Sequence, residues 1–134
     1  MNTPGTIHRP LLVAGAMTLF AAVALGAFGA HGLEGHLTVK AEDWWETAVR
    51  YHLAHGLGIL LVATIAHALP RPGLARLSGW LMLTGVVLFC GSLYLMALVD
   101  VRWLALATPL GGMLWLAAWA ALAGAALRPS DRSG

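Results

Sequence analysis

Four long apolar runs alternate with short charged segments along this chain of 134 residues. No Asp, Glu, Lys or Arg interrupts a run, and each run is long enough to cross a hydrocarbon core of about 30 Å as an α-helix. We therefore predict an all-α protein, an integral membrane bundle of four transmembrane helices with up-down topology. The runs are Pro10–Leu33, Tyr51–Pro70, Leu77–Val99 and Trp103–Leu127, which predict spans at about 10–33, 50–69, 77–99 and 103–127 in a single domain, 1–134, with short tails at 1–9 and 128–134.

A polar stretch, Lys40–Arg50, precedes the second span. Its acids Glu42 and Asp43 favour a helix start, where the helix dipole attracts negative charge, so we predict an amphipathic helical extension of the second span. Tryptophans near span ends are typical of the interfacial aromatic belt, where they anchor a protein in the membrane. The anchoring prediction covers Trp44, Trp45, Trp80 and Trp103.

Composition supports the membrane assignment and excludes other classes. The chain is 59% hydrophobic and only 10% charged, whereas soluble domains carry roughly a quarter charged residues. The net charge of +2 comes from scattered basic residues, which is not the basic patch of a nucleic-acid-binding protein. A cleaved signal peptide is disfavoured because the first run stays apolar as far as Leu33. Lone Cys90 excludes an intramolecular disulfide.

The distribution of basic residues predicts the orientation. Lys and Arg are more numerous in the segments that lie on the same side as the two termini, so we predict cytoplasmic termini. That side collects Arg9, Arg71, Arg76, Arg128 and Arg132, and the opposite side has Lys40, Arg50 and Arg102.

Small residues predict where the helices pack closely. Gly15, Ala22 and Gly29 recur every seven residues in the first span, with Gly26 beside them, and Gly91 contributes to a similar face in the third. In the fourth span Pro109 predicts a packing kink, a late helix start or a break that accepts a ligand. Gly111 and Gly112 follow it, and Thr108, Gly112, Trp115 and Trp119 share one side.

Polar residues gather in the half of the bundle away from the termini. Such residues are costly inside a membrane and are therefore candidates for function. We favour a structural role, in which they hydrogen-bond between helices and fix the register of the bundle. A metal or haem site built from His31, His52 and His55 is a weak alternative, as is a proton path. The candidate polar cluster is His31, Tyr51, His55, Ser92, Tyr94 and Thr108.

Several motifs together resemble the YgdD-like family of small four-span membrane proteins, a domain-of-unknown-function family. The resemblance implies a bacterial inner-membrane protein and no established reaction. In that pattern the position of His52 more often holds glutamine, which disfavours a shared metal site. The motifs are Gly26-Ala27-Phe28-Gly29-Ala30-His31-Gly32-Leu33, then Trp45, Thr47-Ala48, Tyr51 and His55, then Gly91-Ser92-Leu93-Tyr94, then Thr108-Pro109-Leu110-Gly111-Gly112.

These observations predict a non-enzymatic membrane protein without a cofactor. Its expected partners are membrane lipid and either a second copy of itself or another membrane protein, with no nucleic acid. The alternative is a membrane protein that binds a small molecule, proton or metal through the His/Tyr cluster.

Overall fold

The structure is a computed structural model that describes residues 6–99 and 101–127. This part of the chain is helical and contains no strand, and four of its helical segments are long and apolar enough to cross a membrane. The fold class predicted from the sequence is therefore confirmed. The four segments are Arg9–Gly32, Val39–Ala68, Pro72–Leu98 and Arg102–Ala126.

The first hairpin pairs α1 (Arg9–Ala27) with α2 (Val39–Ile65). A π-helical turn, η1 (Phe28–Gly32), follows α1, and a short 3-10 turn, η2 (Ala66–Ala68), follows α2. The hydroxyl of Thr38 caps α2 by accepting the Ala41 N–H at 3.3 Å, so the helix begins well before the apolar run. The predicted polar extension of the second span is thus part of α2.

The second hairpin begins with α3 (Pro72–Gly85), which carries proline at its first position. A π-helical turn, η3 (Val86–Cys90), joins α3 directly to α4 (Gly91–Leu98), so the third span is one rod. The 3-10 turn η4 (Arg102–Leu106) leads into α5 (Ala107–Ala126). Pro109 lies in the first turn of α5, where its missing N–H removes no intrahelical bond. The α-helix of the fourth span begins at Ala107, after the 3-10 turn, which is the late helix start that the sequence allowed.

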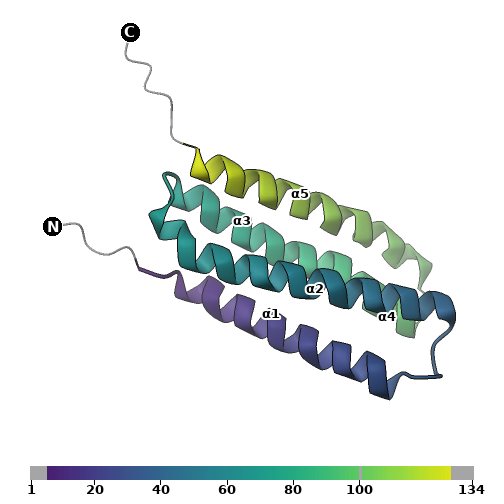
Figure 1. The fold of residues 1–134 in the computed structure, drawn as a ribbon. Helices are drawn as coiled ribbons and strands as arrows, with labels where there is room; N and C mark the ends of the chain where they lie inside the picture. The colour runs from purple at the N-terminus through teal and green to yellow at the C-terminus, as the bar shows by residue number, and fades with distance from the viewer. Residues whose placement is uncertain (1–5, 100, 128–134) are drawn as a thin grey trace, which may run out of the picture.

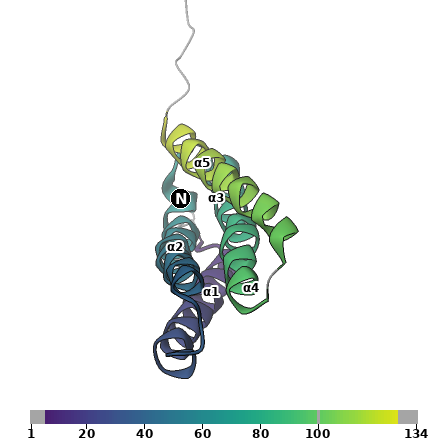
Figure 2. The ribbon, with the colours of Figure 1, turned by 90° about the vertical axis from the view of Figure 1, so that its right-hand side faces the viewer.

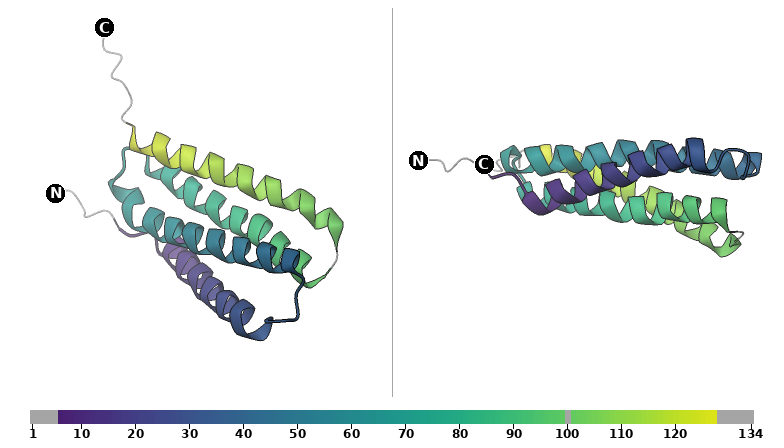
Figure 3. Two further views of the ribbon diagram at one scale, coloured as in Figure 1. Left: turned by 45° about the vertical axis from the view of Figure 1, so that its right-hand side comes forward. Right: turned by 90° about the horizontal axis from the view of Figure 1, so that it is seen from below.

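The rods α2 and α3–η3–α4 form the centre of the bundle. Helix α1 packs on α2, and α5 packs on α3 and η3. Figure 1 shows the four rods side by side in the order α1, α2, α3–η3–α4 and α5, and the end-on view in Figure 2 separates α1 from α5. Both views in Figure 3 show α1 crossing α2 at an angle rather than lying parallel to it.

Two ends of the bundle can be distinguished. The terminal end holds the start of α1, the α2–α3 turn and the end of α5, and the distal end holds the α1–α2 loop and η4 (Figure 1). Backbone bonds close the terminal end: the His8 N–H donates to the Ala63 carbonyl at 3.1 Å, and the Arg71 N–H to the Ala125 carbonyl at 3.2 Å. These bonds satisfy carbonyls in the last turns of α2 and α5.

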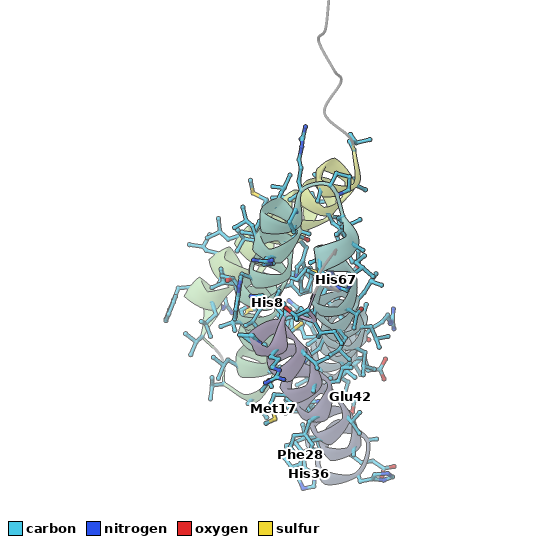
Figure 4. All side chains as sticks on the ribbon, turned by 90° about the vertical axis from the view of Figure 1, so that its left-hand side faces the viewer. His8, Met17, Phe28, His36, Glu42 and His67 are labelled. Atoms are coloured by element: carbon cyan, nitrogen blue, oxygen red, sulfur yellow. The ribbon has the colours of Figure 1, made fainter. Side chains whose placement is uncertain are left out.

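The buried interior consists of two clusters, and large apolar side chains cover the outside, as a bilayer requires. Figure 4 shows Met17 of α1 and Phe28 of η1, and both side chains are exposed. The terminal cluster comprises Leu11, Ile59, Val62, Ala63, Ala66, Ala75, Met82, Ala118 and Ala125. The distal cluster comprises Leu33, Ala41, Trp45, Ala48, Val86, Cys90, Leu93, Tyr94, Ala97 and Trp115.

Candidate functional site

The imidazole of buried His55 is the centre of the interior polar contacts. Its Nδ1 lies 2.9 Å from the Tyr51 carbonyl, one turn earlier on α2, and the Trp119 Nε1–H donates to its Nε2 at 3.3 Å. A carbonyl only accepts and an indole N–H only donates, so a neutral ring with hydrogen on Nδ1 satisfies both contacts. Both ring nitrogens of His55 are therefore engaged within the bundle.

Aromatic rings of α2 and α5 surround this histidine. The His55 ring stacks on the Trp115 indole with 3.7 Å between centroids and 7° between planes. Tyr51 lies parallel to the same indole at 5.5 Å, and Phe89 of η3 contacts it at 4.6 Å. Helices α2 and α5 are thus joined across the bundle mainly by large side chains, which explains why this level contains so many rings.

Each π-helical turn is preceded by a carbonyl that accepts a tryptophan N–H. Trp45 of α2 donates to the Leu25 carbonyl at 2.9 Å, just before η1, and Trp115 of α5 donates to the Met82 carbonyl at 3.1 Å, just before η3. Each carbonyl also accepts a backbone N–H, from Phe28 and Val86 respectively, so the indole N–H is a second donor at the change from α-helical to π-helical bonding. The two hairpins therefore share one kind of contact, a tryptophan N–H that donates to a carbonyl near a π-helical turn.

Glycines make room for both indoles. A Cβ atom at Gly29 would overlap the Trp45 indole, and one at Gly85 would overlap the Trp115 indole. The anchoring prediction is wrong for Trp45, because its side chain is buried at 4% exposure and bonds to α1 instead of lying at the membrane surface. For Trp44, Trp80 and Trp103 anchoring stays a prediction.

Two further polar pairs join neighbouring rods. The Ser92 hydroxyl donates to the Phe89 carbonyl at 2.9 Å and lies 2.7 Å from the Thr108 hydroxyl, which links α4 to the start of α5. His52 Nδ1 lies 3.2 Å from the Tyr94 hydroxyl, which links α2 to α4. The Tyr94 ring in turn packs edge-on against Trp45 at 4.6 Å.

The structure places most residues of the candidate polar cluster in separate pairs rather than in one cluster: Tyr51 with His55, Ser92 with Thr108, and Tyr94 with His52. Tyr51 and His55 face α5, while His52, three residues before His55, faces α4, so the two histidines have different partners. His31 is exposed on η1 and joins neither group. No group of three His, Cys, Asp or Glu side chains within the described residues is arranged to hold a metal ion.

The predicted packing glycines differ in what surrounds them. Gly15 faces Leu60 of α2, and Gly26 faces Val49, while Ala22 between them is fully buried. Gly111 approaches the backbone of η3 most closely, since a Cβ there would lie 2.5 Å from the Phe89 nitrogen. A Cβ at Gly91 would meet nothing within 4 Å, and one at Gly112 would make only an ordinary contact with the Phe89 ring at 3.8 Å; Pro109 is exposed.

Sequence reasoning missed the inward orientation of Trp45 and the two π-helical turns. The spacing of Trp115 and Trp119 indicated one helix face, but it did not indicate their acceptors. Gly29 within η1 and Gly85 directly before η3 could be recognised only as small residues, because the indole that fills each space comes from another helix.

Comparison with known proteins adds the family. A family model described as "Protein of unknown function (DUF423)" matches residues 25–112, about two thirds of the chain. The chain belongs to the DUF423 family. Among curated relatives, the UPF0382 membrane protein YwdK of Bacillus subtilis (strain 168) is 43% identical over 120 residues, which cover 90% of this chain and 98% of that protein.

Other relatives carry the same description. A UPF0382 membrane protein of Staphylococcus haemolyticus is 44% identical over 108 residues, covering 81% of this chain and 87% of that protein. One of Haemophilus influenzae is 43% identical over 108 residues, covering 81% and 86%. No solved structure matches the chain. These UPF0382 relatives and the four apolar helices together identify an integral membrane protein of unknown activity.

Proposed function

We propose that this DUF423 protein is a non-enzymatic component of the bacterial inner membrane that acts by contacting other membrane proteins, copies of itself or lipid through its outer helix faces. Both termini are cytoplasmic in this proposal, as the basic residues on their side favour. The narrower resemblance to the YgdD-like proteins belongs to the same proposal.

The observation that carries the proposal is the internal use of the polar groups. Both nitrogens of His55, both hydroxyls of the Ser92–Thr108 pair and the Trp45 and Trp115 N–H groups have partners inside the bundle. A site for catalysis or ion transfer needs groups that can exchange partners with a substrate or water. These groups instead connect helices, as register-fixing hydrogen bonds do.

The outer helices offer the surface for such contacts. Only 22% of the apolar window in the first span and 17% in the fourth is buried, against 44% and 39% in the two central spans. Large side chains such as Phe20 on α1 and Leu116 on α5 are more than two-thirds exposed. One face of each outer helix is therefore available to lipid or to another helix.

A matched pair of histidine variants tests the proposal. His55→Ala removes a stacked ring and two hydrogen bonds, so we expect it to lower the free energy of unfolding in detergent by about 2 kcal/mol. His31→Ala changes an exposed side chain and should alter it by less than about 0.5 kcal/mol. Unfolding would be followed by circular dichroism during titration with a denaturing detergent.

Native mass spectrometry of the same proteins, released from their own membrane in mild detergent, gives the deciding result. We expect the wild-type chain and both variants to carry the same protein or lipid partners and no stoichiometric metal or small molecule. A metal, haem or small molecule that the wild type retains and folded His55→Ala loses would contradict the proposal. That result would favour the alternative of a ligand-binding His/Tyr cluster.

Topology is tested separately. Single cysteines placed in the 1–9 tail and at Lys40, in a Cys90→Ser background, would be labelled in intact cells with a membrane-impermeant thiol reagent. We expect labelling at position 40 and none in the tail. The opposite pattern would show that the termini are outside.

A further inference from the structure

A hollow lies between α1 and α2 at the distal end of the bundle. Its volume is about 550 Å³, which is within the roughly 300–1,000 Å³ of small-molecule sites. On the side of α1 and η1 its wall consists of Gly26, Gly29 and Ala30, which are too small to fill it. The charged side chains that line it are Glu34 of the α1–α2 loop and Glu42, Glu46 and Arg50 of α2.

One face of α2 presents its residues to this hollow in a definite order of depth. Arg50 lies about 6 Å deeper in the membrane than Glu46, and about 12 Å deeper than Glu42, at about 1.5 Å per helical residue. Val49 and Leu53, at and below the level of Arg50, supply an apolar lining. The charge-free run begins directly after Arg50, so this arginine is at the edge of the hydrocarbon and the acids lie in the headgroup region. From the hydrocarbon outward, the hollow is therefore apolar, then positive, then negative.

The charged groups of the hollow are available to a ligand. Among the described residues no salt bridge joins Arg50 to an acid, although Glu46 is one helical turn away. All four charged side chains are exposed, and within the described part of the chain no three of its acids are grouped as metal ligands. A guanidinium and carboxylates at different depths suit a ligand that carries an anion and a cation some distance apart.

We propose that this hollow binds one phospholipid with a primary ammonium headgroup, of the phosphatidylethanolamine class. The phosphate binds Arg50, the ammonium binds Glu46 and Glu42, and the upper part of an acyl chain lies against Leu53. A phospholipid in a bilayer has the matching order, with acyl chains innermost, phosphate at the boundary and the headgroup cation outermost. The inference rests on the proposed function in one respect, the contact with lipid, and it specifies the lipid.

The chemistry of the acids selects this headgroup over others. A primary ammonium has three N–H donors, and a carboxylate only accepts, so each acid can form a charge-assisted hydrogen bond with it. The quaternary ammonium of phosphatidylcholine has no N–H to donate. The glycerol headgroup of phosphatidylglycerol has no positive charge, which would leave Glu42 and Glu46 without a counter-ion.

Lipid retention tests the site directly. The protein would be placed in nanodiscs of equal parts phosphatidylethanolamine, phosphatidylcholine and phosphatidylglycerol with identical acyl chains, then released into mild detergent, and retained lipid would be counted by native mass spectrometry. We expect one phosphatidylethanolamine in preference to the other two lipids. The double variant E42Q/E46Q should lower this preference about tenfold, because the charged acceptors of the ammonium are lost. Arg50→Gln should instead lower the retention of every phospholipid, because the phosphate is common to all three.

Two further variants separate the hollow from the general charge of α2. Asp43→Asn removes an acid next to Glu42 that does not line the hollow, and it should leave the lipid preference unchanged. Ala30→Trp fills part of the hollow without changing its charge and should reduce retention. Circular dichroism would show that each variant is folded, which is expected because all the substituted side chains are exposed.

Three outcomes would overturn the proposal. The first is equal retention of phosphatidylethanolamine and phosphatidylcholine by the wild type, and the second is a preference that persists in folded E42Q/E46Q or is lost equally in Asp43→Asn. The third is displacement of the lipid by glycerophosphoethanolamine, which lacks acyl chains and would assign the hollow to a soluble ligand. The proposed function fails on a different result, a metal or small molecule that depends on His55, so the two failures can be distinguished.

Discussion

The terminal half of the bundle packs aliphatic side chains and alanines against one another, whereas the distal half packs aromatic rings and hydrogen-bonded polar groups. The terminal cluster contains no aromatic residue, and four backbone atoms from separate elements close that end through two hydrogen bonds. The distal cluster includes Trp45, Tyr94 and Trp115, and both π-helical turns adjoin it.

This difference lies in the side chains between the helices. Small residues let helices pack by van der Waals contact alone, which is the main attraction available where lipid is as apolar as the helix surface. In the distal half, rings from α2 and α5 stack between the two helices, and their N–H groups then need partners. The polar contacts of the distal half thus accompany its large side chains.

The largest predicted effect comes from a glycine that faces backbone. Gly111→Ala would place a Cβ 2.5 Å from the Phe89 nitrogen and 3.0 Å from the Gly85 carbonyl, neither of which can move without separating α5 from η3. We expect a loss of about 3 kcal/mol in the free energy of unfolding. Detergent-titration unfolding measures it.

Two other glycines supply the comparison for that variant. Gly112→Ala meets the Phe89 ring only at 3.8 Å and should be nearly neutral. Gly79→Ala, in the terminal half, meets the side-chain ends of Leu11 and Val62, which can shift, so its loss should be smaller than that of Gly111→Ala. An equal loss at Gly79 and Gly111 would show that the two halves resist added volume alike.

A smaller effect is predicted for the tryptophan that faces η3. Trp115→Phe keeps a ring but removes the N–H that bonds to the Met82 carbonyl, and it reduces the stack with His55. We expect a loss of about 2 kcal/mol, against about 1 kcal/mol for Trp119→Phe, whose side chain is 42% exposed. If Trp115→Phe cost no more than Trp119→Phe, the bond to the Met82 carbonyl would contribute no more than the bond from Trp119 to His55.

The coarse fold could be predicted from the sequence because membrane physics determines it. Charge-free runs of sufficient length must be helical, and the start of α2 followed from acids at a helix N-terminus. Gly15 and Gly29 could be assigned to a close-packed face from spacing alone. The side chains that pack on that face could not be predicted, because Leu60 and Trp45 come from a different helix.

The candidate site was harder to predict for the same reason. His52 and His55 are three residues apart and lie on the same side of α2, yet His52 contacts Tyr94 of α4 and His55 contacts Trp119 of α5, so their spacing suggested a pair that the fold separates. His31 lies on the π-helical turn η1, and its side chain is exposed. No single-sequence pattern indicates where such a turn begins.

Two buried serines, one in each half, are predicted to respond to the same substitution with opposite signs. Ser78 in α3 is fully buried, and its hydroxyl has no hydrogen-bond partner within the described residues, so it carries an uncompensated desolvation cost. Ser92 in α4 is buried too, but its hydroxyl bonds to Phe89 and Thr108. We therefore expect Ser78→Ala to raise the free energy of unfolding by up to about 1 kcal/mol and Ser92→Ala to lower it by about 0.6 kcal/mol.

The conclusion depends on the sign of the change in the free energy of unfolding. The two substitutions can be compared directly, because they remove the same atom at comparable burial and the detergent titration is identical for both. A Thr108→Val variant tests the Ser92 prediction further. Once the Thr108 hydroxyl is absent, Ser92→Ala should lower the free energy of unfolding by less than it does in the wild type. If Ser78→Ala destabilised the protein, its hydroxyl would have a partner in the membrane, and the terminal half would then rely on polar contacts as the distal half does.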